Sequence, residues 1–236
     1  MTNLMSIRGK KYEKARQLVP RCQILSAKEA LAKVKDLAYA KFDKSIDVDV
    51  NVGIDPSKGE QVVRGSLVLP HGRGKAIKVL VFAKGDYAEA AKKAGADYVG
   101  AEDLVEKISA GWMDFTFAVA TPDLMGLVGK LAKVLGPRGL LPNKKLGTVT
   151  LDIAGVVADL KRGQLFFKND KNGIVHFSIG KVSFADDKLY DNLLAFIKSL
   201  SIAKPSSSKG KFLKKVTLSS TMGLGYAVSP DELLQA

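Results

Sequence analysis

Apolar and polar residues alternate along one early stretch of the chain. Every second residue from Ile46 to Ile54 is apolar, and the residues between them are aspartate, asparagine or glycine. A period of two predicts a strand with one buried and one solvated face. A second apolar run, 62–69, follows turn residues at 55–59, and we expect it to pair with the first strand.

Helical spacing appears on both sides of the central part of the chain. Ser26 followed by Glu29 has the spacing of a capping box, which predicts a helix from Ser26 to about Lys41. Far downstream, apolar residues recur at helical spacing over 189–200, behind two aspartates that suit a helix N-terminus. A second helix is therefore expected there.

The pattern changes between residues 77 and 120. Continuous apolar runs at 77–83, 98–100 and 115–120 are separated by helical stretches at 87–94 and 102–110. This β-α-β-α-β order is typical of a small parallel sheet that is covered on both faces. A further helix is expected over 152–162, ended by Gly163.

The alternating pattern then returns. Residues 164–168 and 174–179 flank an Asn- and Gly-rich turn and predict a hairpin, and 212–219 predicts a last strand. The fold class is therefore α/β with two domains. A split, two-layer α+β domain (1–70 plus 159–236) is interrupted by a Rossmann-like, three-layer parallel domain (71–158), although one continuous mixed sheet is an alternative.

The charge follows this division. The chain has 236 residues and a net charge of +13, of which residues 1–70 carry +5, residues 159–236 carry +5 and the middle carries +3. An excess of Lys and Arg favours a polyanionic partner, although a solvated basic surface would explain it equally well. With 46% hydrophobic residues and one cysteine, global disorder and a disulfide scaffold are excluded.

Catalytic and metal-binding patterns are missing. The chain has one cysteine, Cys22, and two histidines, His71 and His176, at no spacing that resembles a zinc site. It has no G-x-S-x-G elbow and no phosphate loop, and residues 126–130 only imitate one. We expect no enzyme, cofactor or metal. A nucleotide-binding α/β enzyme that uses the inserted domain is the alternative.

No apolar stretch reaches the roughly 18 residues that span a bilayer. We therefore expect a cytoplasmic protein with no membrane partner.

Three segments combine features that suit RNA. Lys41 and Phe42 pair a cation with an aromatic ring, which favours contact with a phosphate and an exposed base. The strand 164–168 ends in two phenylalanines and Lys168, with one ring expected to point inward and one outward, and His176 and Lys181 follow nearby. The stretch 220–223 offers hydroxyls, a methionine and a glycine. Each segment has a structural alternative: Phe42 fills the core, His176 is a structural imidazole with satisfied hydrogen bonds, and 220–223 is simply a turn.

Several runs closely resemble the bacterial large-subunit ribosomal protein L-one family. They are Lys41-Phe42-Asp43, Gly53-Ile54-Asp55-Pro56, Val63-Arg64-Gly65, Leu69-Pro70-His71-Gly72, Ala94-Gly95-Ala96-Asp97, Gly111-Trp112-Met113-Asp114, Ala120-Thr121-Pro122-Asp123, Leu135-Gly136-Pro137-Arg138-Gly139-Leu140, Gly180-Lys181 with Ser183-Phe184, and Ser220-Thr221-Met222-Gly223. The resemblance spans about residues 8–228. Leu224 departs from it, because the family usually has proline there.

The resemblance implies a function and partners. It implies a structural protein that binds large-subunit ribosomal RNA of the mobile stalk beside the tRNA exit site and assists release of deacylated tRNA. It also implies repression of translation through the leader of its own messenger RNA, and no obligate homo-oligomer. The RNA-contacting residues that it implies are Lys41, Phe42, Lys168, His176, Lys181, Ser220, Thr221, Met222 and Gly223.

Overall fold

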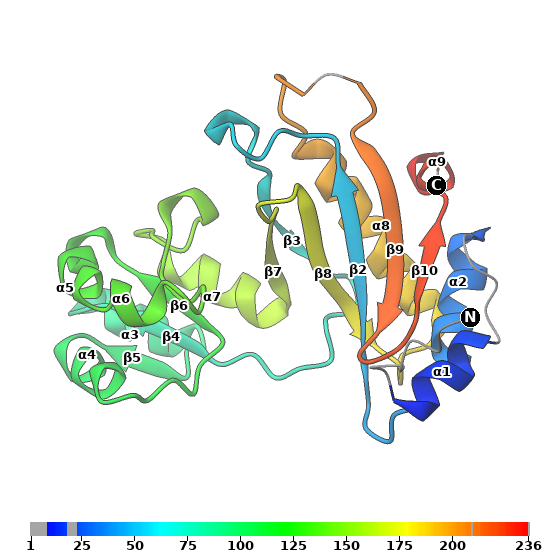
Figure 1. Ribbon diagram of the computed structural model, residues 1–236. Coiled ribbons are helices and arrows are strands. Elements are labelled where there is room, and N and C mark those ends of the chain that lie inside the picture. The colour runs from blue at the N-terminus through cyan, green and yellow to red at the C-terminus, as the bar shows by residue number, and fades with distance from the viewer. Residues whose placement is uncertain (1–8, 18–22, 209, 236) are drawn as a thin grey trace. The chain divides into compact units, whose positions relative to one another are not determined.

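The computed structural model describes residues 9–17, 23–208 and 210–235 (Figure 1). Cys22 lies outside the described residues. The chain divides into two compact units: the first contains the residues up to Gly74 and from Phe167 onward, and the second is Lys75–Phe166. One unit is thus built from both ends of the chain, and the other is inserted into it.

The first unit is a two-layer α+β fold. Its elements are α1 (Lys10–Gln17), β1 (Ile24–Leu25), α2 (Ala27–Asp36), β2 (Ser45–Val52), the 3-10 helix η1 (Gly59–Gln61), β3 (Arg64–Val68), β7 (Gln164–Lys168), β8 (Ile174–Lys181), α8 (Asp186–Ile202), β9 (Leu213–Ser220), β10 (Gly225–Val228) and α9 (Pro230–Gln235). Five strands form one sheet in the order β1-β10-β9-β2-β8. Helices α2 and α8 pack together against this sheet.

Strand β2 lies between β8 and β9 and pairs antiparallel with both. Its alternation is confirmed, because every second side chain from Ile46 to Val52 is buried. On β8 the ring of Phe177 stacks on Phe196 of α8, with ring centroids 4.5 Å apart. The apolar face of the sheet therefore packs on the helices, and the other face carries the polar residues.

Two predicted strand pairings are wrong. Strand β3 does not pair with β2 but with β7, in a separate two-stranded sheet. Strand β7 is not in the sheet of β8; an isolated bridge joins Asn169, the residue after β7, to Val175. Sequence alternation shows which face of a strand is buried, but it carries no information about the partner strand. At Gly65 an added Cβ would lie 2.5 Å from the Phe167 ring, which shows how closely these elements pack.

The second unit has the predicted parallel architecture. Its elements are β4 (Val79–Phe82), α3 (Asp86–Lys93), β5 (Tyr98–Gly100), α4 (Glu102–Ser109), β6 (Phe117–Ala120), η2 (Pro122–Leu124), α5 (Met125–Lys130), α6 (Ala132–Leu135), η3 (Lys144–Leu146) and α7 (Ile153–Arg162). The sheet order is β5-β4-β6, with both pairings parallel. One apolar core contains residues of α4, α5 and α6, and a second core contains residues of α3 and α7, so the sheet is covered on both faces.

The boundaries between the units differ from the predicted ones. The predicted division after residue 158 would cut through α7, whose Ile153, Val157 and Leu160 are all buried in the second unit. The chain crosses between units within β7. Phe166 packs edge-on against Phe117 of the second unit, and Phe167 against Phe196 of the first. The two rings thus alternate between the faces of β7 as expected, but the outer ring, Phe166, is half-buried against Phe117.

Candidate nucleic-acid interface

The segment that carries Lys41 and Phe42 is not helical. Ser26 caps α2 as expected, accepting a hydrogen bond from the Glu29 amide, but the helix ends at Asp36 rather than near Lys41. The residues between α2 and β2 are left as an irregular connection. Both candidate residues are exposed there, and Phe42 retains 52% of its accessible surface. The alternative in which the Phe42 side chain fills the hydrophobic core is therefore wrong.

Hydrogen bonds hold this connection in place. The amine of Lys44, which is only 6% exposed, donates to the Ala38 carbonyl at 2.7 Å. The Asp43 carboxylate accepts from the amide and hydroxyl of Ser183, at 3.3 and 3.0 Å. Lys181 donates to the Asp43 carbonyl at 3.2 Å. The backbone on either side of Phe42 is thus fixed, and an exposed ring on a fixed backbone loses little entropy on binding.

The turn between β9 and β10 holds Met222 in an unusual conformation. Gly223 donates its amide to the Ser220 carbonyl at 2.7 Å, which closes the turn. Met222 has a φ of 64°, and among the described residues no other non-glycine has a positive φ. A left-handed backbone costs an ordinary L-residue about 1–2 kcal/mol. Met222 is also 66% exposed, so local strain presents an apolar side chain to solvent, a combination that points to function.

The turn is attached to the first residue of β2 and to the connection that precedes it. Thr221 donates its amide to the Ser45 carbonyl at 3.0 Å, and its hydroxyl accepts from the Ser45 amide at 3.2 Å. The hydroxyl of Tyr39 donates to the carbonyl of Met222. These contacts join two segments about 180 residues apart in sequence, as the Tyr39–Met222 separation of 183 shows. Sequence reasoning missed Tyr39, because no local pattern distinguishes it from a surface tyrosine.

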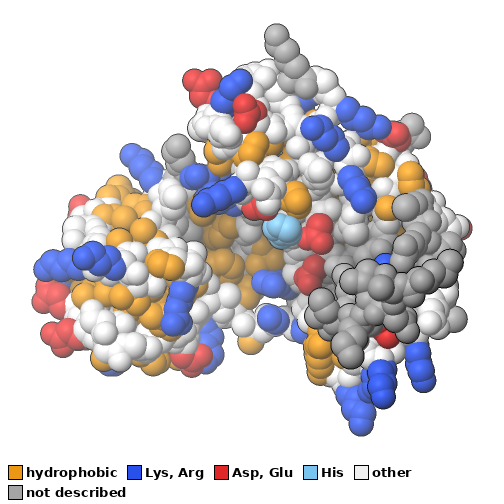
Figure 2. All heavy atoms as spheres, in the orientation of Figure 1, with side chains coloured by type: hydrophobic (Ala, Val, Ile, Leu, Met, Phe, Trp, Pro, Cys, Tyr) orange, Lys and Arg blue, Asp and Glu red, His pale blue; other side chains and the backbone are white. Residues whose placement is uncertain are grey.

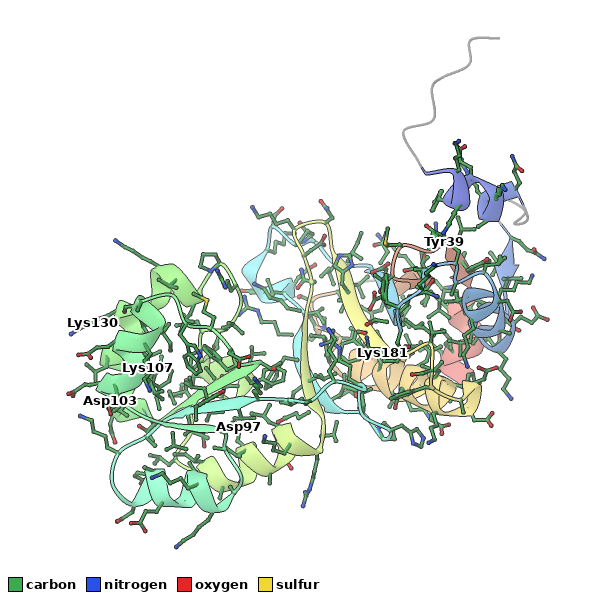
Figure 3. All side chains as sticks on the ribbon, turned by 90° about the horizontal axis from the view of Figure 1, so that it is seen from below. Tyr39, Asp97, Asp103, Lys107, Lys130 and Lys181 are labelled. Atoms are coloured by element: carbon green, nitrogen blue, oxygen red, sulfur yellow. The ribbon has the colours of Figure 1, made fainter. Side chains whose placement is uncertain are left out.

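Seven of the nine predicted contact residues therefore lie at one end of the five-stranded sheet, where β2 begins and β9 ends, and all of these except the buried Ser220 contribute to its surface (Figure 1). We call this surface the turn face; it consists of Lys41, Phe42, Lys181, Thr221, Met222 and Gly223. Figure 3 is viewed toward this end and labels Tyr39 and Lys181. Basic side chains project from the same end, at the bottom of the first unit in Figure 2.

The other three predicted contacts do not belong to this surface. Ser220 is only 5% exposed, so it supports the turn from beneath. Lys168 is exposed at the end of β7, in the other sheet. His176 lies on the polar face of β8, five residues along the strand from Lys181. The predicted cluster is therefore only partly right: Lys168 belongs to the other sheet, whereas His176 and Lys181 share the polar face of β8, opposite Asp49 and Ser45 of β2.

His176 is surrounded by carboxylates. Its Nδ1 lies 2.6 Å from an Asp49 oxygen, and its Nε2 lies 3.7 Å from Asp170. In Figure 2 a histidine is visible beside acidic side chains. Hydrogen bonds from the Ile174 amide, and then from the Asn172 amide and His176, hold the pKa of Asp170 below its usual value. These negative charges disfavour a phosphate close to His176.

The described residues offer no metal centre, since they contain no group of three or more His, Cys, Asp or Glu side chains able to hold an ion. Within the same residues no helix is long and apolar enough to cross a membrane.

Comparison with known proteins identifies the fold. The model of the ribosomal protein L1p/L10e family matches residues 9–224. The chain belongs to this family. It is also 52% identical over 226 residues to the large ribosomal subunit protein uL1 of Desulfotalea psychrophila, covering 96% of each chain.

Membership of this family decides between a structural RNA-binding protein and a nucleotide-binding enzyme. Proteins of the ribosomal protein L1p/L10e family are structural, non-enzymatic proteins of the large ribosomal subunit, and binding of ribosomal RNA is general to the family. The chain is thus a ribosome-associated RNA-binding protein, and the alternative of a nucleotide-binding enzyme is wrong.

Proposed function

We propose that the turn face binds the ribosomal RNA of the mobile stalk beside the tRNA exit site. The observation that carries the proposal is the strained, exposed Met222, whose turn is bonded to Tyr39 and Ser45, the residues that flank the exposed Phe42 in sequence. An aromatic ring and an apolar side chain on a rigid surface suit splayed bases, and Lys41 suits a neighbouring phosphate. Recognition then rests on preformed shape, with counterion release adding affinity.

The proposal extends to two further roles. In the cytoplasm the protein assists release of deacylated tRNA from the exit site, with the second unit meeting the tRNA. The turn face also binds a similar RNA fold in the leader of the protein's own messenger RNA and represses its translation. The charge of the first unit supports the binding of messenger RNA: with its boundaries at Gly74 and Phe167, this unit carries +10 of the total +13.

A gel-shift titration against stalk RNA tests the turn face. We expect Phe42→Ala and Met222→Ala each to weaken binding by about 1–3 kcal/mol, as for a base-stacking contact. Tyr87→Ala, which removes another exposed aromatic ring from the second unit, is the matched control and should bind normally. Unchanged affinity in folded Phe42→Ala and Met222→Ala proteins would exclude this surface as the binding site.

The contribution of charge to RNA binding is measured by the salt dependence of the affinity. Lys41→Ala should reduce the salt dependence of binding by roughly one unit of slope, because one phosphate contact is lost. Lys188→Ala, an exposed lysine of α8, is the control and should leave the slope unaltered. The same titration with the leader of the protein's own messenger RNA tests repression. If one surface binds both RNAs, the turn-face variants should bind the leader and the stalk RNA more weakly to the same extent.

A further inference from the structure

Met222 is the most accessible methionine among the described residues. It retains 66% of its accessible surface. Met113 and Met125 are half-buried and pack against the apolar core of the second unit. Met1 and Met5 lie outside the described residues. A soluble oxidant therefore reaches the sulfur of Met222 more readily than the sulfur of Met113 or Met125.

The backbone that carries this sulfur is fixed. Tyr39, which is labelled in Figure 3, donates its hydroxyl to the carbonyl of Met222. The Gly223 amide closes the turn, and Thr221 bonds to the backbone of Ser45. These bonds hold the backbone of the turn in place, so it cannot withdraw a modified side chain at position 222 from the turn face.

Oxidation by a peroxide changes such a side chain without changing its charge. The thioether sulfur attacks one oxygen of hydrogen peroxide, the O–O bond breaks, an S–O bond forms, and the remaining oxygen leaves as water. The sulfur is thereby oxidised and the peroxide reduced. The product, methionine sulfoxide, is polar and chiral, whereas the thioether is flexible and apolar.

A sulfoxide at position 222 does not suit contact with a base. Its oxygen is hydrogen-bonded to water in the free protein, and the flat face of a base offers no hydrogen-bond donor. Contact would therefore remove water from this oxygen without replacing the hydrogen bond, which costs free energy. The thioether has no such cost, because it is only weakly polar.

We infer that Met222 is a site of reversible oxidation by peroxides, and that the sulfoxide weakens RNA binding at the turn face. The inference rests on the proposed function of that surface. RNA bound there covers the sulfur, so oxidation acts on protein that is free of RNA. Methionine sulfoxide reductases regenerate the thioether: the oxygen leaves as water, and thiols of the reducing system are oxidised to a disulfide.

The test treats the full chain with dilute hydrogen peroxide and measures its binding to stalk RNA by fluorescence anisotropy. Peptide mass spectrometry locates each sulfoxide. Met5→Leu/Met113→Leu/Met125→Leu, the triple variant, leaves Met1 and Met222 as the only methionines. Met222→Leu removes the proposed site and keeps an apolar side chain of similar volume. Each protein is compared with its own untreated sample, so differences in basal affinity do not enter the comparison.

We expect oxidation to lower the stalk-RNA affinity of the wild type and of the triple variant roughly 10-fold, a loss in the range of one base-stacking contact. The salt slope should stay unchanged, because the sulfoxide is uncharged. The melting temperature of the triple variant should also stay unchanged, since Met222 is exposed. Reductase treatment should restore the affinity, and oxidised Met222→Leu should bind like its untreated sample.

Protection by RNA provides a second measurement. Saturating stalk RNA should slow sulfoxide formation at Met222 several-fold, whereas Met113 and Met125 of the second unit should react at unchanged rates. An equal rate at Met222 with and without RNA would overturn the inference, because the sulfur would then lie outside the RNA contact.

Three other results would also overturn the inference. They are complete oxidation of Met222 without loss of affinity in the triple variant, an equal loss in oxidised Met222→Leu, and oxidation of Met113 or Met125 before Met222. Untreated wild-type protein that does not bind stalk RNA would instead refute the proposed function of the turn face. The two failures are therefore distinguishable.

Discussion

Replacing Met222 by glycine and by alanine separates backbone strain from RNA contact. Both variants remove the exposed side chain, so the small amount of apolar burial that is lost is the same. The left-handed backbone costs alanine about 1–2 kcal/mol and glycine almost nothing. The glycine variant loses about 0.4–1 kcal/mol of stability, because its unfolded chain has greater conformational freedom. The difference leaves Met222→Gly more stable than Met222→Ala by about 1 kcal/mol.

Thermal unfolding of the two variants measures this difference. A gap of about 1 kcal/mol corresponds to a melting temperature roughly 2–4 °C higher for the glycine variant. The same pair of substitutions at Leu234, an exposed helical position in α9, is the control and should give the opposite order, because glycine disfavours helix. Stalk-RNA affinity should fall by about 1–3 kcal/mol in both Met222 variants.

Two results would refute this reasoning. A glycine variant less stable than the alanine variant would show that Met222 is not held in a left-handed conformation. Normal RNA affinity in both variants would show that the strain does not serve RNA contact, even if the order of stabilities is as expected.

Three further predictions concern stability. Asn192→Leu should destabilise the first unit by at least about 2 kcal/mol in urea unfolding, because Asn192 is fully buried and bonds three backbone groups that the variant leaves unpaired. Gly65→Ala should lower the melting temperature, since the new Cβ meets the Phe167 ring at 2.5 Å; a neutral effect would show that the ring moves freely. Burial raises the pKa of Asp97, but bonds from Lys161 and a backbone amide outweigh it, and the pKa lies below its usual value. This carboxylate therefore stabilises the fold above its ordinary pKa, and the melting-temperature difference between wild type and Asp97→Asn should shrink as the pH falls below about 4.

Much of the local structure follows from the sequence. Asp152 accepts from the Gly155 amide at the start of α7, and Gly163, with a φ of 107°, ends the helix as expected. The parallel strands of the second unit were recognisable because strands buried on both faces read as uninterrupted apolar runs. These features depend on neighbours within a few residues, so the sequence contains the information they need.

Strand partners and unit boundaries could not be predicted from the sequence. The stretch 164–168 reads as half of a hairpin, yet its partner is β3, about 100 residues earlier. Pairing depends on which distant surfaces are complementary, and alternation is the same for every candidate partner. The predicted boundary within α7 failed for a related reason, because a helix belongs to whichever core buries its apolar side.

The residues of the candidate site were also predicted only in part from the sequence. From the sequence we could identify Lys41, Phe42, Thr221 and Met222 as residue types that suit RNA, and the family resemblance supported them. The sequence also suggested Lys168 and His176, which the structure places away from the turn face, His176 among carboxylates. Proximity in sequence misled here, because side chains on one strand separate by about 3.3 Å per residue.

By itself, then, the sequence determined most of the longer helices and strands, the two-domain α/β class, the basic character and the family of this protein. Each of these depends on composition, on local periodicity or on runs of consecutive residues. Only the tertiary structure decided that α2 stops before Phe42, that Tyr39 and Thr221 hold Met222 in a left-handed turn, and that this turn is bonded to Tyr39 and Ser45, which flank Phe42 in sequence. The binding surface is formed where segments distant in sequence meet, and long-range packing determines which segments meet.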